Sequence, residues 1–240
     1  MGGTHYKHYC VYSHRNRQEN GTPFRSHLGV YRLVKVMVRQ PVTDPAVVDF
    51  IKEMVIKNPK PENCYNLALM IYDLRDESRY EEMAEYLMKA SDEGHADARA
   101  ILGDCYFYGL GVEQDQKKAV ELFISAAEMG SLMGRYSAGN ELLIGKVVDA
   151  DYQKAYTYLK KVADEGDDRA INSLGVMYLF GYHVKKDLRK AKRYFKKSAM
   201  LGNEQAIHNY GKLKAASKDA DFSDEPILKP SEMPKEDVKE

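Results

Sequence analysis

The sequence lacks the features that mark several large classes of protein. Three cysteines in 240 residues are too few for the multi-bridge framework of a small secreted domain, which favours a reducing compartment such as the cytoplasm. No run approaches the roughly 18 apolar residues of a membrane span, and residues 1–21 have no apolar core of a secretory signal. Neither membrane insertion nor export is therefore expected.

The chain as a whole also lacks net charge, although its two ends are charged. The 36 basic and 36 acidic side chains cancel, which excludes a general attraction to nucleic acid or to acidic membranes. Residues 1–40 nevertheless carry seven basic side chains and one acid, whereas residues 215–240 carry eight acids and four lysines. A partner that is attracted by charge would therefore bind at one end of the chain.

Glycine recurs through the middle of the chain in three columns with a constant spacing of 36 residues. The columns are Gly94, Gly130, Gly166 and Gly202; Gly103, Gly139, Gly175 and Gly211; and Gly109, Gly145 and Gly181. Asp115, Asp151 and Asp187 keep the same step, as do columns of valine, lysine and alanine. A period of this length predicts a repeat architecture.

Each repeat unit has the signals of two helices. Gly103 leaves room for a neighbouring helix to approach closely, and Gly109 ends the first helix. Asp115 is placed to cap the start of the second helix, and Gly130 supplies the left-handed position that closes it. A helix pair of this size cannot bury its apolar face alone, so the pattern predicts a mainly α fold, an α-solenoid of stacked antiparallel pairs.

The unit from Ala98 to Gly130 resembles the pattern A-x3-L-G-x2-Y-x2-G-x-G-V-x2-D-x2-K-A-x7-A-x2-G of the Sel-one-like repeat (SLR) family, a relative of the tetratricopeptide repeat. The units at 134–166 and 170–202 follow it with departures in single columns. The resemblance implies an adaptor that holds other proteins together. Secreted, cysteine-rich members of the family bind or hydrolyse β-lactams, so a β-lactamase-like hydrolase is a second alternative, although the paired cysteines of those proteins are missing here.

The sequence predicts four segments. They are a basic segment at 1–43 with a small β element around Asn20-Gly21, a capping helix and linker at 44–61, the repeat array at 62–214, and an acidic, disordered tail at 215–240. Within the array, residues 62–95 form a degenerate unit, 97–203 three full units and 204–214 a partial unit. Asp44-Pro45 predicts the start of the capping helix, which runs to about Lys57.

One face of each first helix lies opposite its apolar stripe and recurs along one wall of the solenoid. The candidate partner-binding residues on this face are Ile101, Asp104, Tyr108, Asn140, Ile144, Val176 and Phe180. Tyr108, Ile144 and Phe180 would form a spaced apolar row that grips an extended or helical peptide. The same three side chains would equally serve to pack adjacent repeats together. The leading hypothesis is a non-catalytic scaffold that binds a partner protein through this groove.

The basic N-terminal segment supports an alternative, a nucleic-acid-associated protein. Its basic residues are Arg15, Arg17, Arg25, Arg32, Lys35 and Arg39, which would contact a DNA or RNA backbone or dock on an acidic partner. A weak zinc candidate, His5, His8, Cys10 and His14, fits no common module and is explained as well by a polar strand. No nucleophile elbow or phosphate-binding glycine loop occurs, so no catalytic residue and no cofactor are predicted.

Overall fold

The computed structural model describes residues 44–216. Its α-helices are α2 (Pro45–Lys57), α3 (Pro61–Asp73), α4 (Tyr80–Asp92), α5 (Ala96–Tyr108), α6 (Gln116–Glu128), α7 (Leu132–Ile144), α8 (Tyr152–Asp164), α9 (Asp168–Phe180), α10 (Leu188–Met200) and α11 (Glu204–Ala216). This range contains no strand, which confirms the mainly α class. The predicted β element, the basic patch and the zinc candidate lie outside the described residues, as does nearly all of the acidic tail.

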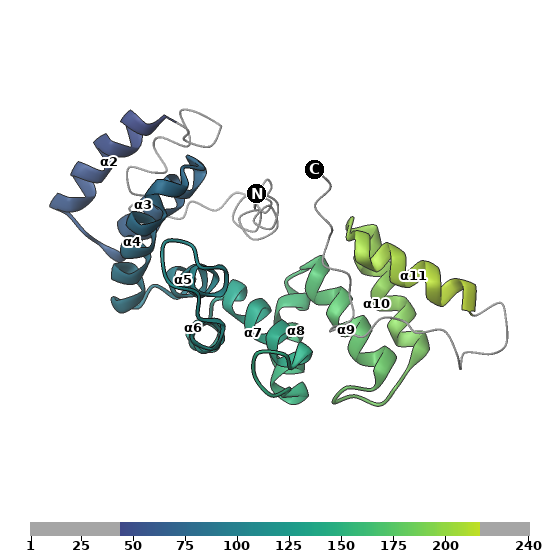
Figure 1. Cartoon of the computed structure of the whole chain (residues 1–240). Helices are drawn as coiled ribbons and strands as arrows, with labels where there is room; N and C mark the ends of the chain where they lie inside the picture. The colour runs from purple at the N-terminus through teal and green to yellow at the C-terminus, as the bar shows by residue number, and fades with distance from the viewer. Residues whose placement is uncertain (1–43, 217–240) are drawn as a thin grey trace, which may run out of the picture.

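Each helix packs against the next one along the chain, so that the pairs follow one another along an arc (Figure 1). This is the connectivity of a solenoid, in which every unit contacts only its neighbours. The first helices of successive units, α5 and α7, also contact each other directly, whereas the second helices α6 and α8 contact each other less. We call the side formed by α3, α5, α7, α9 and α11 the inner wall.

Aspartates start the second helices, as the repeat pattern predicts. Asp115, Asp151 and Asp187 each accept a hydrogen bond from the backbone amide three residues on, at 3.0, 2.9 and 2.9 Å. These bonds satisfy amides that have no partner inside the helix. The start of each second helix is therefore fixed by one carboxylate, and the pairing repeats with the sequence period.

Two glycines set how closely the units approach. A Cβ atom on Gly103 would lie 2.5 Å from the Phe123 ring, which confirms that this glycine lets α5 and α6 pack closely. Gly111 has φ +66°, and a Cβ atom there would lie 2.0 Å from the Tyr80 carbonyl oxygen. Because a side chain at Gly111 would meet backbone, the turn after α5 fits only against the start of α4.

The N-terminal unit differs from the others at both ends. Asp44 accepts a hydrogen bond from the Ala46 amide at 2.9 Å, which confirms the predicted start of α2. Pro61 is the first residue of α3, whereas the sequence assigned it only to the break after α2. Proline suits that position because the amide it lacks has no helical partner there. A 3₁₀ turn at Glu77–Arg79 replaces the glycine turn of the later units.

The core runs the length of the stack as overlapping clusters of buried side chains. Helices α2 to α5 share the first cluster, α7 to α9 another, and α9 to α11 the last. Leu159 and Phe195 from second helices are fully buried between first helices. Each second helix therefore bridges two units. Between residues 44 and 216, none of the helices has the length and apolar character that a membrane span requires.

Candidate partner-binding site

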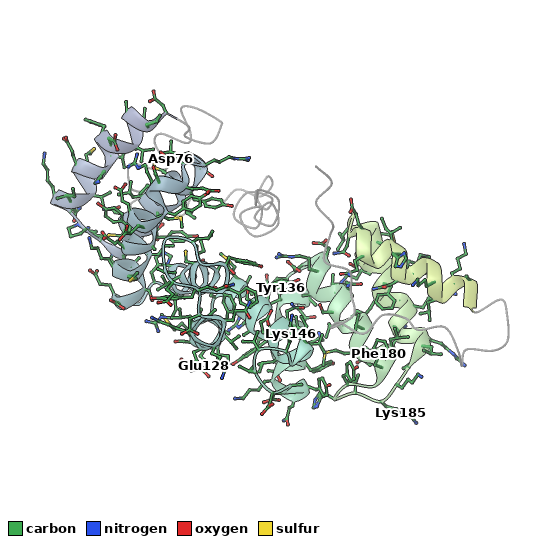
Figure 2. The ribbon with its side chains drawn as sticks, viewed as in Figure 1. Asp76, Glu128, Tyr136, Lys146, Phe180 and Lys185 are labelled. Carbon is green, nitrogen blue, oxygen red and sulfur yellow. The ribbon has the colours of Figure 1, made fainter. Side chains whose placement is uncertain are left out.

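The inner wall is hollowed where α5 passes α7. Its lining residues are Asp104, Phe107 and Tyr108 from α5, Phe123 from α6, and Tyr136, Ser137, Asn140 and Glu141 from α7. The space between these residues is about 240 Å³ with open solvent included, and its enclosed part has room for about one water molecule. In Figure 2 the Tyr136 label lies on the concave side of the arc and the Glu128 label on the convex side. We call this site the α5–α7 hollow.

Helical spacing and the repeat period together bring these residues to one place. Asp104 and Tyr108 lie one turn apart on α5, as do Ser137 and Glu141 on α7. The floor is aromatic, since the rings of Phe107 and Phe123 pack with their centroids 6.3 Å apart. The hollow therefore combines aromatic and polar side chains from three helices.

Asp104 is the most deeply buried acid in the site. It is 3% exposed, and burial raises its pKa to about 8, although the guanidinium of Arg169 acts in the opposite direction. Burial disfavours the charged form of a carboxyl because the protein solvates that charge less well than water does. Asp104 is therefore largely protonated at neutral pH, when nothing else is bound.

Glu141 repeats this behaviour from the facing helix. Burial raises its pKa to about 7, against the opposing charge of Lys146. Two carboxyl groups from neighbouring helices thus line one hollow and both retain protons near neutral pH. Among residues 44–216, no three or more ligand-type side chains lie close enough together to hold a metal ion.

Ser137 lines the same hollow and is buried there without a hydrogen bond to any of the described residues. Its side chain is 6% exposed, and its Oγ atom has no hydrogen-bond partner among the described residues. An unmet buried polar group costs about 1–3 kcal/mol, so folded proteins rarely keep one. The hydroxyl is therefore available to a group that enters the hollow from outside.

The next junction along the wall is closed by an arginine. The Arg169 guanidinium carbon lies 4.2 Å from the centroid of the Tyr136 ring, and its Nη2 donates to Asp167 Oδ2 at 3.1 Å. Burial raises the pKa of Tyr136 to about 12. The cation–π contact joins α9 to α7 beside the α5–α7 hollow, and the ion pair within the start of α9 helps to orient the guanidinium.

A second, apolar hollow adjoins the first on the N-terminal side. Its lining residues are Ala68, Leu69, Tyr72, Met83, Leu87, Ile101, Asp104, Cys105, Leu110 and Met133, and it encloses about 400 Å³ with open solvent included. We call it the α3–α5 hollow. Asp104 lines both hollows, so the inner wall offers an apolar space and a polar space side by side.

The structure separates the residues that the sequence proposed as a groove. Asp104, Tyr108 and Asn140 meet in the α5–α7 hollow, and Ile101 lines the α3–α5 hollow. The remaining three are Ile144, Val176 and Phe180. Val176 is 2% exposed, Phe180 packs on the same core cluster, and Ile144 is half-buried outside both hollows. Their role in binding stays a prediction.

Five lining residues were absent from that set: Phe107, Phe123, Tyr136, Ser137 and Glu141. Ser137 did carry a signal, because it lies on the same face of its helix as Asn140, in the column that holds Ile101 on α5. Glu141 had no signal of this kind, since exposed and buried glutamates look alike in a sequence. Its burial depends on the angle between α5 and α7.

Comparisons with known proteins agree with this fold. The family model described as Sel1 repeat matches residues 96–131, 133–167 and 168–203. A protective antigen present in uropathogenic Escherichia coli strains, whose crystal structure displays an SLR fold, is 25% identical with a TM-score of 0.64, over 79% of this chain and 41% of that one. A Sel1 repeat protein from Oxalobacter formigenes is 27% identical with a TM-score of 0.58, over 69% and 48%.

A third likeness shows the fold alone. The crystal structure of the APC/C hetero-tetramer Cut9–Hcn1 matches with 18% identity and a TM-score of 0.53, over 80% of this chain and 37% of that one. The chain thus spans less than half the length of these three solved structures. No curated protein matches the chain.

Proposed function

We propose that this chain, which carries three Sel1 repeats and shares its fold with solved Sel1 repeat proteins, is a non-catalytic adaptor that binds a segment of a partner protein on its inner wall. Sel1-type and tetratricopeptide-like arrays generally serve as protein-interaction scaffolds. The α5–α7 hollow carries the proposal, because it presents a buried serine hydroxyl with no partner among the described residues.

The two adjacent hollows define what a partner segment needs. An apolar side chain would pack over the α3–α5 hollow, and a polar side chain next to it would lie over the α5–α7 hollow. Tyr108 and Asn140 stand at the rim, where an extended or helical segment would lie across them. A pair of neighbouring pockets lets a few buried side chains supply most of the binding energy.

The chemistry of the hollow supports binding over catalysis. A serine nucleophile needs a base within hydrogen-bond distance, and Ser137 Oγ has no such partner among residues 44–216. Its carboxyl neighbours, Asp104 and Glu141, hold their protons near neutral pH and so make poor bases there. We therefore assign no catalytic residue to the hollow.

The test compares the inner wall with the convex side. Tyr108→Ala with Ile144→Ala alters the inner wall, and Met200→Ala alters an apolar residue that is 79% exposed on the second helix α10. Phe180 is left unchanged because it packs on the core of α9 and α10. The full-length chain and both variants are used to capture interacting proteins, and each recovered protein is quantified.

Loss of one protein in the inner-wall variant, with retention in Met200→Ala, is the expected result. Equal recovery from all three chains would contradict the proposal. A nuclease-treated arm addresses the alternative, since binding that nuclease abolishes would move the function to nucleic acid and to the basic segment at 1–43.

We propose the cytoplasm as the site of action. Cys64 and Cys105 are buried cysteines outside any disulfide, and burial raises the pKa of the Cys64 thiol, as expected for cysteines that pack as small apolar side chains. Buried thiols persist most readily where the surroundings are reducing. Fractionation of the source cells followed by immunoblotting tests this, and recovery outside the cytoplasmic fraction would contradict it.

A further inference from the structure

Helix α11 differs from the other first helices in what covers it. On α5, α7 and α9, a Cβ atom on the close-packing glycine would lie 2.5, 2.8 and 2.6 Å from Phe123, Leu159 and Phe195, respectively, which belong to the second helices. Gly211 continues this column on α11, but a Cβ atom there would meet no described residue within 4 Å. No described helix therefore covers the face of α11 on which a second helix would pack.

The side chains around Gly211 show the same difference. Ile207 is 53% exposed, whereas Ile171, one period earlier on α9, is fully buried. Ala215 is also exposed, whereas its equivalent on α9, Leu179, is buried. Among the described residues, one face of α11 thus stays open where the equivalent face of α9 is packed.

The residues after α11 do not fit the sequence pattern of a second helix. The position that Phe195 holds in the last full unit falls on Ser231 one period later. Pro230 and Pro234 fall inside the same helix span, and proline inside a helix removes a backbone hydrogen bond and clashes with the preceding turn. A helix from another molecule is therefore better suited to this face.

Helix α2, at the other end of the arc, exposes a stripe of the kind that second helices carry (Figure 1). In α10, Phe195 has an alanine four residues before it and another four residues after it. In α2, Phe50 has Ala46 and Met54 at the same spacing. All three side chains are exposed, and Phe50 is 64% exposed. A different face of α2 packs on α3, so this stripe lies on the surface of the described fold.

Exposed apolar side chains gather at these two ends of the array. Eight large apolar side chains are exposed among the described residues, and six of them lie on α2 or from the end of α10 onward. These six are Phe50, Met54, Ile56, Met200, Leu201 and Ile207. Grouped exposed apolar side chains mark interaction surfaces, whereas single ones are normal.

The two faces also carry opposite charges. Asp49 and Glu53 flank Phe50 on α2, and His208 and Lys214 flank Gly211 on α11. All four charged or titratable side chains are exposed. Complementary charge favours the approach of two surfaces and disfavours the pairing of either surface with itself.

We propose that α2 of a second copy of this chain docks on α11, with Phe50 over Gly211, so that copies join end to end. Such a contact joins two different faces, and it therefore builds a ring if the rotation closes or an open chain if it does not. The inference does not depend on the adaptor function proposed above, because neither α2 nor α11 lines the two hollows.

The test measures self-association of the full-length chain by sedimentation velocity at increasing protein concentration. Phe50→Ala removes the docking ring, and Gly211→Leu fills the space over α11. Leucine favours a helix more than glycine does, and its Cβ would meet no described residue, so this variant should fold. Ile56→Ala is the matched control, because Ile56 is 60% exposed on α2 but lies on a different side of that helix from Phe50.

The average mass of the unmodified chain and of Ile56→Ala should rise with concentration. Phe50→Ala and Gly211→Leu should each weaken association by about tenfold, since each removes the central contact. An equal mixture of these two variants should form dimers and nothing larger. In the mixture, one variant still has an intact α11 face and the other an intact α2 face, so one contact remains possible.

Three results would overturn the inference. The first is an unmodified chain that stays monomeric at every concentration. The second is association lost in only one of the two variants, which would indicate two α2 helices or two α11 helices packed on each other. The third is a mixture that forms no dimer. If the unmodified chain is monomeric, hydrogen exchange identifies the occupant: α11 amides that lose protection in Gly211→Leu would show that a segment of the same chain covers this face.

Discussion

Two junctions between first helices, α5 with α7 and α9 with α11, are built from equivalent positions of the repeat. Ser137 of α7 corresponds to Asn209 of α11. Asn209 Nδ2 donates to Asn172 Oδ1 at 3.1 Å, and both side chains are buried. The position equivalent to Asn172 on α5 is Ala100, which has no side-chain group to offer, and Ser137 has no partner among the described residues.

The difference teaches how one scaffold yields both a closed and an open junction. Both junctions belong to units with the same devices, because caps and close-packing glycines recur with the period. Two facing columns decide whether a buried polar pair forms across the junction: the column of Ser137 and Asn209, and the column of Ala100 and Asn172. Where the pair forms, the junction is a structural joint, and where it is missing, polar groups remain for a ligand.

The largest expected effect concerns Asp104, which belongs to the open junction. Its raised pKa means that the folded state keeps a proton that the unfolded state has already lost, so stability falls as pH rises from about 4 to about 8. Asp104→Asn should remove this loss of stability. The loss amounts to a few kcal/mol, because each unit of difference between the folded and unfolded pKa corresponds to about 1.4 kcal/mol. Urea unfolding at pH 5, 7 and 9 would measure the difference.

The matched control for this comparison is Glu128→Gln, since Glu128 is exposed on α6. Its stability profile should follow that of the unmodified chain at every pH. If Asp104→Asn also follows the unmodified chain, then Asp104 ionises as an ordinary surface acid, and the electrostatic description of the open junction is wrong.

The closed junction should respond to loss of its polar pair. Asn209→Ala leaves the buried Asn172 amide unpaired, which should lower the free energy of unfolding by about 1–3 kcal/mol. Asn66→Ala is the control, because the Asn66 bond to Glu62 Oε1 at 3.3 Å lies on the surface and should contribute little. An equal decrease in the free energy of unfolding in the two variants would show that the buried pair does not stabilise the α9–α11 junction.

Much of the fold was predictable from the sequence because its devices are local and periodic. The aspartate caps and the close contact at Gly103 depend on residues within one unit, and the 36-residue spacing repeats them. The break between α2 and α3 was predicted less well. Pro61 opens a helix because the first helical position needs no amide donor, and the sequence alone does not distinguish that role from a helix stop.

The candidate site was predictable only in part, for a physical reason. Asp104, Tyr108 and Asn140 were placed on the inner wall by helical spacing. The burial of Glu141 depends on how closely α5 approaches α7. The sequence of α7 alone does not predict that distance. The lack of a hydrogen-bond partner for Ser137 also depends on both helices. To predict it, one must know which residues of α5 face Ser137.

Glu141→Gln should give a smaller effect than Asp104→Asn. Its raised pKa of about 7 again means that stability is lost as pH rises, here between about pH 4 and pH 7. Because Glu141 is only partly buried, water still screens its charge, and we expect a gain of only about 1 kcal/mol in the variant at pH 8. Unfolding of the variant at pH 5 and pH 8 tests this, and a loss of stability at pH 8 would contradict it.

The smallest effect is expected at Ser137, where the comparison of the two junctions is sharpest. Ser137→Ala removes a hydroxyl that has no partner among the described residues, so the free energy of unfolding should stay within about 0.5 kcal/mol or rise. The equivalent change at Asn209 should be destabilising, because that residue has a partner to lose. If Ser137→Ala instead lowers stability as much as Asn209→Ala, then an ordered water already satisfies the hydroxyl, and both junctions are structural joints.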